Sequence, residues 1–219
     1  MTVEEITDRL GAVRDRIAEL GVHPDDVEVV AVTKGFGADT VAMALAAGLA
    51  HLGENYASEL VAKADQHRDA CWHFLGSLQR NKTARLAPLV SVWEVVDRPA
   101  AADAIAARAP GAAVYIQVNA TGETTKAGCT PGDTDRLVDH SADAGLDVRG
   151  LMTIGPAGDR EGARACFKLV AGLARSLGLG SLSMGMSEDF DLAVGEGSTT
   201  IRLGQALFGP RPNSARARR

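Results

Sequence analysis

Two groups of residues have side chains suited to binding a small molecule, and they lie far apart in the chain. The first is Lys34, which follows the apolar and β-branched run VEVVAVT at residues 27–33. Such a run is typical of a strand buried on both faces, so the lysine amine is expected at the edge of an apolar core. Loss of water favours the neutral amine, a nucleophile that bonds to aldehydes. The alternative is a structural lysine paired with a carboxylate, for which Glu54 is the candidate.

The second group lies in the stretch LSMGMSEDFDLAVGEGSTTIRLGQALFG at residues 182–209. Ser187, followed by two acidic residues, predicts an N-cap at the start of a short helix whose first N–H groups lack partners. Gly204 lets the backbone approach a ligand closely. The two features together predict a phosphate site. The alternative is a capped helix and a turn glycine without a ligand.

One molecule can engage both groups if the fold brings them together. Pyridoxal 5′-phosphate carries an aldehyde and a phosphate, and it suits a site of this composition. Arg202, a permanent cation two residues before Gly204, would then face the pyridine nitrogen and keep it unprotonated, which makes the ring a weaker electron sink. The alternative for Arg202 is a salt bridge to a carboxylate of the fold.

The elements that must position these residues follow a strict alternation. Residues 2–20 predict a first helix, with a capping box at Thr2 and Glu5 and an apolar residue every three or four positions. Helical patterns then separate eight strand-like runs, for example at 100–108, 133–144 and 160–177. The runs are 27–34, 51–54, 72–76, 91–96, 113–119, 148–152, 181–184 and 200–203.

This order predicts a single α/β domain, a (β/α)₈ TIM barrel with one extra N-terminal helix. In a closed barrel the eighth strand pairs with the first, so Lys34 and Gly204 are expected side by side at the end where the strands terminate. An open, doubly wound sheet is the alternative. The barrel is expected to span residues 1–209, and PRPNSARARR at 210–219 is expected to be a flexible basic tail.

Composition narrows the possible partners. The chain has 219 residues, 46% of them hydrophobic, and a formal net charge of −5, which argues against nucleic acid or an anionic membrane surface as the main partner. The first residues lack a secretory pattern and no apolar run is long enough to span a bilayer, so a cytoplasmic protein is expected. Neither Cys71, Cys129 and Cys166 nor the five histidines show metal-ligand spacing, so reduced thiols and no metal site are expected.

Several motifs in series are similar to those of the pyridoxal-phosphate homeostasis protein family, single-domain relatives of the alanine racemase N-terminal barrel. The resemblance extends over nearly the whole chain. The motifs are TKGFGADTV, HLGENYASEL, WHFLGSLQRNK, IQVNATGETTKAG, GLMTIGP and LSMGMSEDFDLAVGEGSTTIRLGQALFGPR.

The resemblance implies a fold-type III barrel that holds pyridoxal phosphate as an internal aldimine on Lys34. It also implies roles for other cofactor-binding residues. These are Asn55 beside the ring, Met186-Ser187 and Gly204-Gln205 around the phosphate, and Arg202 at the ring nitrogen. Lys126, in the loop NATGETTKAG, is similar to a lysine that takes part in handing the cofactor on. The family usually has a hydroxyl residue where Gln205 stands, so the contact at this position is expected from the backbone N–H.

The resemblance favours a carrier over an enzyme. In alanine racemase a second domain brings a tyrosine to the other cofactor face, and neither Tyr56 nor Tyr115 is placed to replace it here. We therefore expect a monomer without catalytic activity of its own that holds pyridoxal phosphate and releases it to apo-enzymes. The alternatives are a racemase of low efficiency, a Schiff-base aldolase using Lys34, and an interaction protein with a vestigial site.

Overall fold

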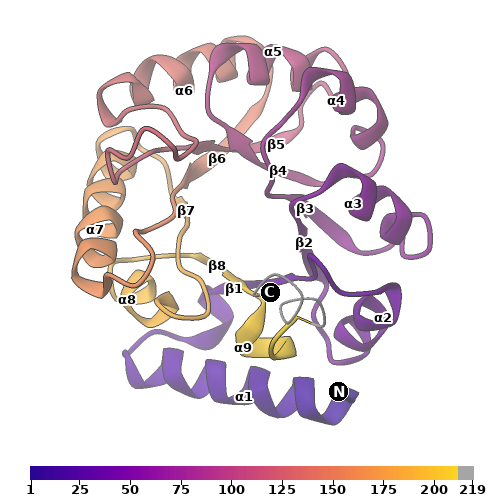
Figure 1. Ribbon diagram of the computed structural model, residues 1–219. Helices are drawn as coiled ribbons and strands as arrows, with labels where there is room; N and C mark the ends of the chain where they lie inside the picture. Colours follow the sequence, from indigo (N-terminus) through magenta and orange to yellow (C-terminus); the bar gives the residue numbers. More distant parts are fainter. Residues whose placement is uncertain (212–219) are drawn as a thin grey trace.

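The strands form a closed parallel barrel, seen along its axis in Figure 1. The computed structural model describes residues 1–211, and over these residues the barrel has eight strands in sequence order. They are β1 Glu28–Val32, β2 His51–Glu54, β3 Cys71–Phe74, β4 Val92–Val96, β5 Ala113–Gln117, β6 Asp147–Met152, β7 Ser181–Ser183 and β8 Thr200–Leu203. The predicted barrel is confirmed, and the open sheet is wrong.

Helices surround the strands, as Figure 1 shows. They are α1 Val3–Glu19, α2 Ala38–Ala46, α3 Ala57–Ala64, α4 Arg80–Leu86, α5 Pro99–Ala106, α6 Thr134–Asp143, α7 Arg160–Ser176, α8 Phe190–Gly195 and α9 Gln205–Phe208. Among the described residues, no helix combines the length and apolar character needed to cross a membrane. The predicted tail at 210–219 lies mostly outside the described residues, which include only Pro210 and Arg211 of it.

The extra helix forms as its sequence predicts. The Thr2 side chain accepts a hydrogen bond from the Glu5 amide, and the Glu5 carboxylate accepts one from the Thr2 amide, which satisfies two donors that the helix start leaves free. The apolar residues of α1 form one buried stripe. Arg9 donates a 3.0 Å hydrogen bond to the carbonyl of Leu207 in α9, so α1 holds the short helix that follows β8.

Side chains alternate along each strand between two environments. On β2 and β3, Leu52, Trp72 and Phe74 belong to the apolar core that packs against the helices. The residues between them face the barrel interior, which is partly polar. His73, Glu94, Ser183 and Arg202 are all buried there, and they contact one another through hydrogen bonds and ion pairs.

Closure of the barrel depends on pairing between β8 and β1. Four pairs of residues are in register, from Glu28 with Thr200 to Ala31 with Leu203. The chain therefore leaves β1 and β8 at the same level, with Lys34 and Gly204 at adjacent strand ends. The predicted neighbourhood of the two groups is confirmed at the level of the backbone.

Gly150 allows β6 and β7 to pair closely, and its replacement by alanine is expected to destabilise the protein by about 3 kcal/mol. A Cβ atom there would lie 1.9 Å from the backbone carbonyl oxygen of Ser181. Gly172, inside α7, has nothing within 4 Å of its Cβ position, so Gly172→Ala is the matched control and should stabilise by up to about 1 kcal/mol. Urea unfolding measures both variants. Equal effects would contradict the close approach of the two strands.

Candidate functional site

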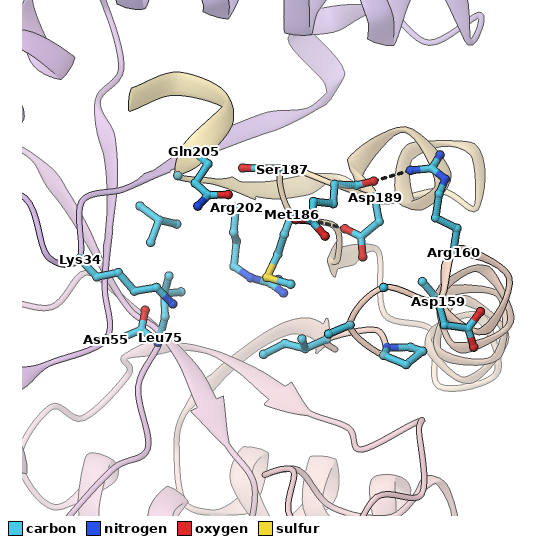
Figure 2. A pocket seen from close by; sticks show the side chains of 18 of the residues that line it. Lys34, Asn55, Leu75, Asp159, Arg160, Met186, Ser187, Asp189, Arg202 and Gln205 are labelled. Carbon is cyan, nitrogen blue, oxygen red and sulfur yellow. Dashed lines mark hydrogen bonds between the residues drawn. The ribbon is translucent and has the colours of Figure 1, made fainter. Parts of the chain in front are cut away.

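A cavity of about 280 Å³ opens at the carboxyl ends of the strands. One side is formed by the ends of β1 to β3, and the other by the loops that follow β6, β7 and β8 (Figure 2). All seven residues predicted to bind the cofactor line it: Lys34, Asn55, Met186, Ser187, Arg202, Gly204 and Gln205. The fold therefore brings the predicted site residues together.

Lys34 lies two residues beyond the end of β1, and its side chain reaches into the cavity beside Asn55 and Leu75 (Figure 2). Within the described residues, its amine has no hydrogen bond or ion pair. Burial lowers the pKa of the Lys34 amine, and the positive charges of Arg211 and Arg202 lower it further, whereas Glu54 acts in the opposite direction. The neutral, nucleophilic form is thus favoured relative to an exposed lysine.

The expected alternative partner of Lys34, Glu54, is occupied by a different lysine. The Glu54 carboxylate lies 2.5 Å from the Lys63 amine and accepts a 2.7 Å hydrogen bond from the Thr33 hydroxyl. Lys63 also donates to the carbonyl of Thr33 at 2.9 Å. The suggested pair between Lys34 and Glu54 is therefore wrong. Lys63 neutralises Glu54 and leaves Lys34 available in the cavity.

Arg202 is held rigidly below the cavity by the barrel interior. One guanidinium nitrogen donates to the Ser183 hydroxyl at 2.6 Å and the other to the Thr153 carbonyl at 2.8 Å. The Glu94 carboxylate lies 3.7 Å away and is fully buried. Burial lowers the pKa of Arg202 below its ordinary value, and the negative charges of Glu94 and Asp189 only partly offset this effect. Arg202 therefore forms a salt bridge with Glu94, which was the alternative expected from the sequence. It also lines the cavity.

The loop after β7 is built differently from the prediction. Helix α8 begins at Phe190, so the predicted N-cap at Ser187 is wrong. Gly185, with φ at +93°, turns the chain where a Cβ atom would lie 2.8 Å from the Phe190 Cα atom. Ser187 instead accepts a 3.0 Å hydrogen bond from the amide of Ala206 in α9. Ser187 thus joins the loop after β7 to the segment after β8.

Asp189 is a site residue that the sequence analysis missed. Its carboxylate accepts a 2.6 Å hydrogen bond from the Met186 amide, one of the groups expected to face a phosphate. Burial raises the pKa of Asp189, and the bond from Met186 only partly offsets this effect. Arg160, also missed, lines the cavity and pairs with Asp191 at 2.9 Å. Arg160 and Asp191 are 31 residues apart and meet only through the arrangement of the loops, so no motif spacing predicts their contact.

The Asn55 side chain has an oxygen atom that is available to accept a hydrogen bond from a ligand. Its Oδ1 atom is buried and lacks a hydrogen-bond partner among the described residues. A buried oxygen of this kind is rare in native proteins, since leaving it unpaired costs about 1–3 kcal/mol. It lies beside the unpartnered amine of Lys34 and in a cavity that also contains Arg160, Arg202 and Arg211. The positive charges of the arginines suit an anionic molecule, and the amine of Lys34 suits one that also carries an aldehyde.

Lys126 lies outside the residues that line the cavity. Its amine pairs with Glu123 at 2.7 Å and donates to the Gly155 carbonyl at 3.2 Å. Pro156, the next residue, does line the cavity. Lys126 is therefore attached to a neighbouring loop, and its part in cofactor transfer stays a prediction.

Comparison with known proteins agrees with this geometry. The family model described as "Alanine racemase, N-terminal domain" matches residues 9–212. A pyridoxal phosphate homeostasis protein of Pseudomonas aeruginosa is 38% identical, with 98% of this chain and 97% of the relative covered. One of Deinococcus radiodurans is 39% identical, with 91% and 97% covered. The chain belongs to the pyridoxal phosphate homeostasis protein family.

A solved structure from the same group of proteins has the same architecture. PipY of Synechococcus elongatus, whose structure is described as having PLP bound, superposes with a TM-score of 0.82 at 32% identity. The match covers 93% of this chain and 100% of PipY. The family resemblance drawn from the motifs is thus confirmed by sequence and by fold.

The lowered pKa of Lys34 predicts reaction with an acylating reagent at unusually low pH. Only the neutral amine reacts, so the pH midpoint of Lys34 acylation is expected below the ordinary lysine value of about 10.4. Arg211→Ala should move the midpoint upward, because it removes one of the positive charges, whereas Arg175→Ala on the outer face of α7 should not. Peptide mass spectrometry measures the extent of acylation. A wild-type midpoint at or above the ordinary value would contradict this account.

Proposed function

We propose that this protein binds pyridoxal phosphate through Lys34 and releases it to apo-enzymes, without a catalytic reaction of its own. The observation that supports it best is the juxtaposition of an unpartnered, half-buried amine with the loops after β7 and β8 in one cavity. The names of the relatives and the cofactor described for PipY agree with this assignment.

Each side of the cavity has a distinct task in this proposal. When bound, the cofactor supplies an aldehyde that bonds reversibly to amines and a ring that withdraws electrons. Lys34 forms the covalent attachment, and its lowered pKa favours the neutral amine that attachment requires. The backbone and side chains at Met186-Ser187 and Gly204-Gln205 bind the phosphate. Asp189 must then share or give up the Met186 amide that it now holds.

Arg202 keeps the ring nitrogen unprotonated in this arrangement. The contacts with Ser183, Thr153 and Glu94 fix the guanidinium in place and preserve its positive charge. A proton on a neighbouring ring nitrogen would be repelled by that charge. The ring then withdraws electrons less strongly, which suits a protein that stores the cofactor rather than one that uses it.

The composition of the cavity supports a carrier rather than a racemase. Racemisation needs proton-transfer groups on two faces of the substrate. Among the described residues, Lys34 is the only lysine that lines the cavity, and no histidine or tyrosine lines it. Three carboxylates of the described residues line it: Asp159 accepts a hydrogen bond from the Gly162 amide, Asp189 accepts one from the Met186 amide, and Glu188 is exposed to solvent. Tyr56, 59% exposed, lies in a separate hollow.

Release is proposed to occur at the exposed rim. Met186 and Gln205 are both exposed and line the cavity, so an amine of another protein can approach the attachment point from that side. Direct transfer, a monomeric state and the part of Lys126 belong to the proposal.

Reduction with borohydride tests the attachment. Protein loaded with pyridoxal phosphate and then dialysed should be yellow, and reduction should leave one pyridoxyl group, on Lys34, by peptide mass spectrometry. Lys34→Ala should lose the adduct, whereas Lys168→Ala on α7 should keep it.

The loaded protein should restore activity to a pyridoxal-phosphate-dependent apo-enzyme and interconvert no amino-acid enantiomers. Equal cofactor stoichiometry in wild type and Lys34→Ala would instead support an interaction protein with a vestigial site.

Asn55→Ala should separate cofactor affinity from the stability of the cofactor-free protein. The unpaired Oδ1 atom contributes nothing favourable without a ligand, so the unfolding midpoint of the cofactor-free variant should stay within error of wild type or rise. Cofactor affinity should fall about tenfold, as expected for one lost hydrogen bond of about 1.4 kcal/mol. Thermal unfolding and equilibrium dialysis measure the two effects. A large loss of stability without cofactor would show that Asn55 has a structural role.

A further inference from the structure

A second cluster of reactive side chains lies at the opposite end of the barrel from Lys34. Glu28, His51 and Cys71 are the first residues of β1, β2 and β3, three neighbouring strands, and His73 follows two positions after Cys71. The pairing of β2 with β3 sets His51 directly against Cys71. These four residues, here called the amino-end cluster, have no part in the proposed cofactor site.

Three ligand atoms of this cluster lie close enough together to bind one metal ion. One nitrogen each from His51 and His73 and the Cys71 sulfur lie within 4.8 Å of one another. His51 Nδ1 is 3.0 Å from His73 Nε2, and the Cys71 sulfur is 3.9 Å from His73 Nε2. Zinc bonds of ordinary length place tetrahedral ligand atoms about 3.3–3.6 Å apart. These two distances therefore differ from the tetrahedral values by a few tenths of an ångström.

Glu28 is placed to provide the fourth ligand. One of its carboxylate oxygens lies 3.1 Å from His51 Nδ1 and the other 3.8 Å from His73 Nε2, so the carboxylate borders the space between the other three ligand atoms. Glu28 and His51 are 35% and 34% exposed at the side chain, which leaves a route for a cation from solvent. The three ligand atoms are thus accessible, and a movement of the Glu28 side chain would complete a set of four.

His73 is oriented as metal-binding histidines usually are. Its Nδ1 atom lies 2.7 Å from the carboxylate of Glu94, and the side chain is only 1% exposed. A carboxylate on one ring nitrogen fixes the proton there and directs the lone pair of the other nitrogen toward the metal. When Nδ1 alone carries the proton, the lone pair of Nε2 faces the Cys71 sulfur and His51 Nδ1. This outer carboxylate is an observation independent of the cluster itself.

We propose that the amino-end cluster is a zinc site formed by Glu28, His51, Cys71 and His73. A thiolate and a carboxylate bring two negative charges, which one divalent cation neutralises. Mixed nitrogen, sulfur and oxygen ligands in tetrahedral spacing favour Zn²⁺ over Mg²⁺ or Ca²⁺, which take oxygen ligands in larger number. The ion ties the first residues of three strands together and closes that end of the barrel interior.

The competing arrangement is a hydrogen-bonded network without a metal. Burial by itself raises the pKa of the Cys71 thiol, but hydrogen bonds with His51 and His73 outweigh burial and bring it to about 6. Such a network stabilises a thiolate with protons alone. The two arrangements differ in a direct observable, because only the metal site forms a bond from sulfur to a metal ion.

Cobalt substitution distinguishes the metal site from the hydrogen-bonded network. Protein without a polyhistidine tag is stripped with a chelator and titrated with Co²⁺, whose spectrum reports its coordination. We expect one equivalent to give the intense visible bands of tetrahedral Co²⁺ and a thiolate-to-cobalt charge-transfer band in the near ultraviolet. One equivalent of Zn²⁺ should abolish both, and a large excess of Mg²⁺ should abolish neither.

Matched variants assign the site. Cys71→Ser should eliminate the charge-transfer band and weaken Zn²⁺ binding at least tenfold, whereas Cys129→Ser should retain the wild-type spectrum and affinity. His51→Gln, at a partly exposed position, should weaken binding as well and provides the test if Cys71→Ser fails to fold. The proposal is overturned if wild-type protein gives only the weak spectrum of octahedral Co²⁺, or if Cys71→Ser and His51→Gln both bind as wild type does.

Discussion

The pairing of β8 with β1 is the interaction on which the candidate site depends. It closes the barrel and brings the chain around residue 34 beside the chain around residue 204, although some 170 residues separate them in sequence. The same pairing lets Arg202 extend from β8 into the interior beneath the cavity. Without closure, the Lys34 amine and the loops after β7 and β8 would lie at opposite edges of an open sheet and could not line one cavity.

The partly polar interior of the barrel follows from the need to hold Arg202. A buried guanidinium is costly unless its donors are satisfied and its charge is compensated. Ser183 and Thr153 provide the acceptors, and Glu94 provides the charge. Glu94 in turn contacts His73, so a continuous chain of contacts runs from the cavity to the amino-end cluster. The two ends of the barrel are thus connected through polar side chains rather than separated by an apolar core.

The sequence predicted the barrel and most of the site because both depend on local patterns and strand order. The apolar run before Lys34 and the alternation of strands and helices sufficed to place Lys34 beside Gly204. Ser187 was misassigned because α8 begins at Phe190 and the Ser187 hydroxyl instead accepts a hydrogen bond from Ala206, a long-range contact that local pattern does not reveal. Glu94 and the amino-end cluster were missed, since their contacts arise from strand register and the barrel interior. Asp189 was missed although its contact with Met186 is local, because the turn that forms it does not follow from the sequence pattern.

The division of the candidate site between the two ends of the chain has a consequence for biosynthesis. The ribosome makes the segment with Lys34 early, but β7, β8 and α9 emerge last, and domains fold as units. A nascent chain therefore exposes a reactive lysine before it possesses the groups that would retain a phosphate. On the proposed function, selective retention of the aldehyde cofactor would require the final strand to have docked.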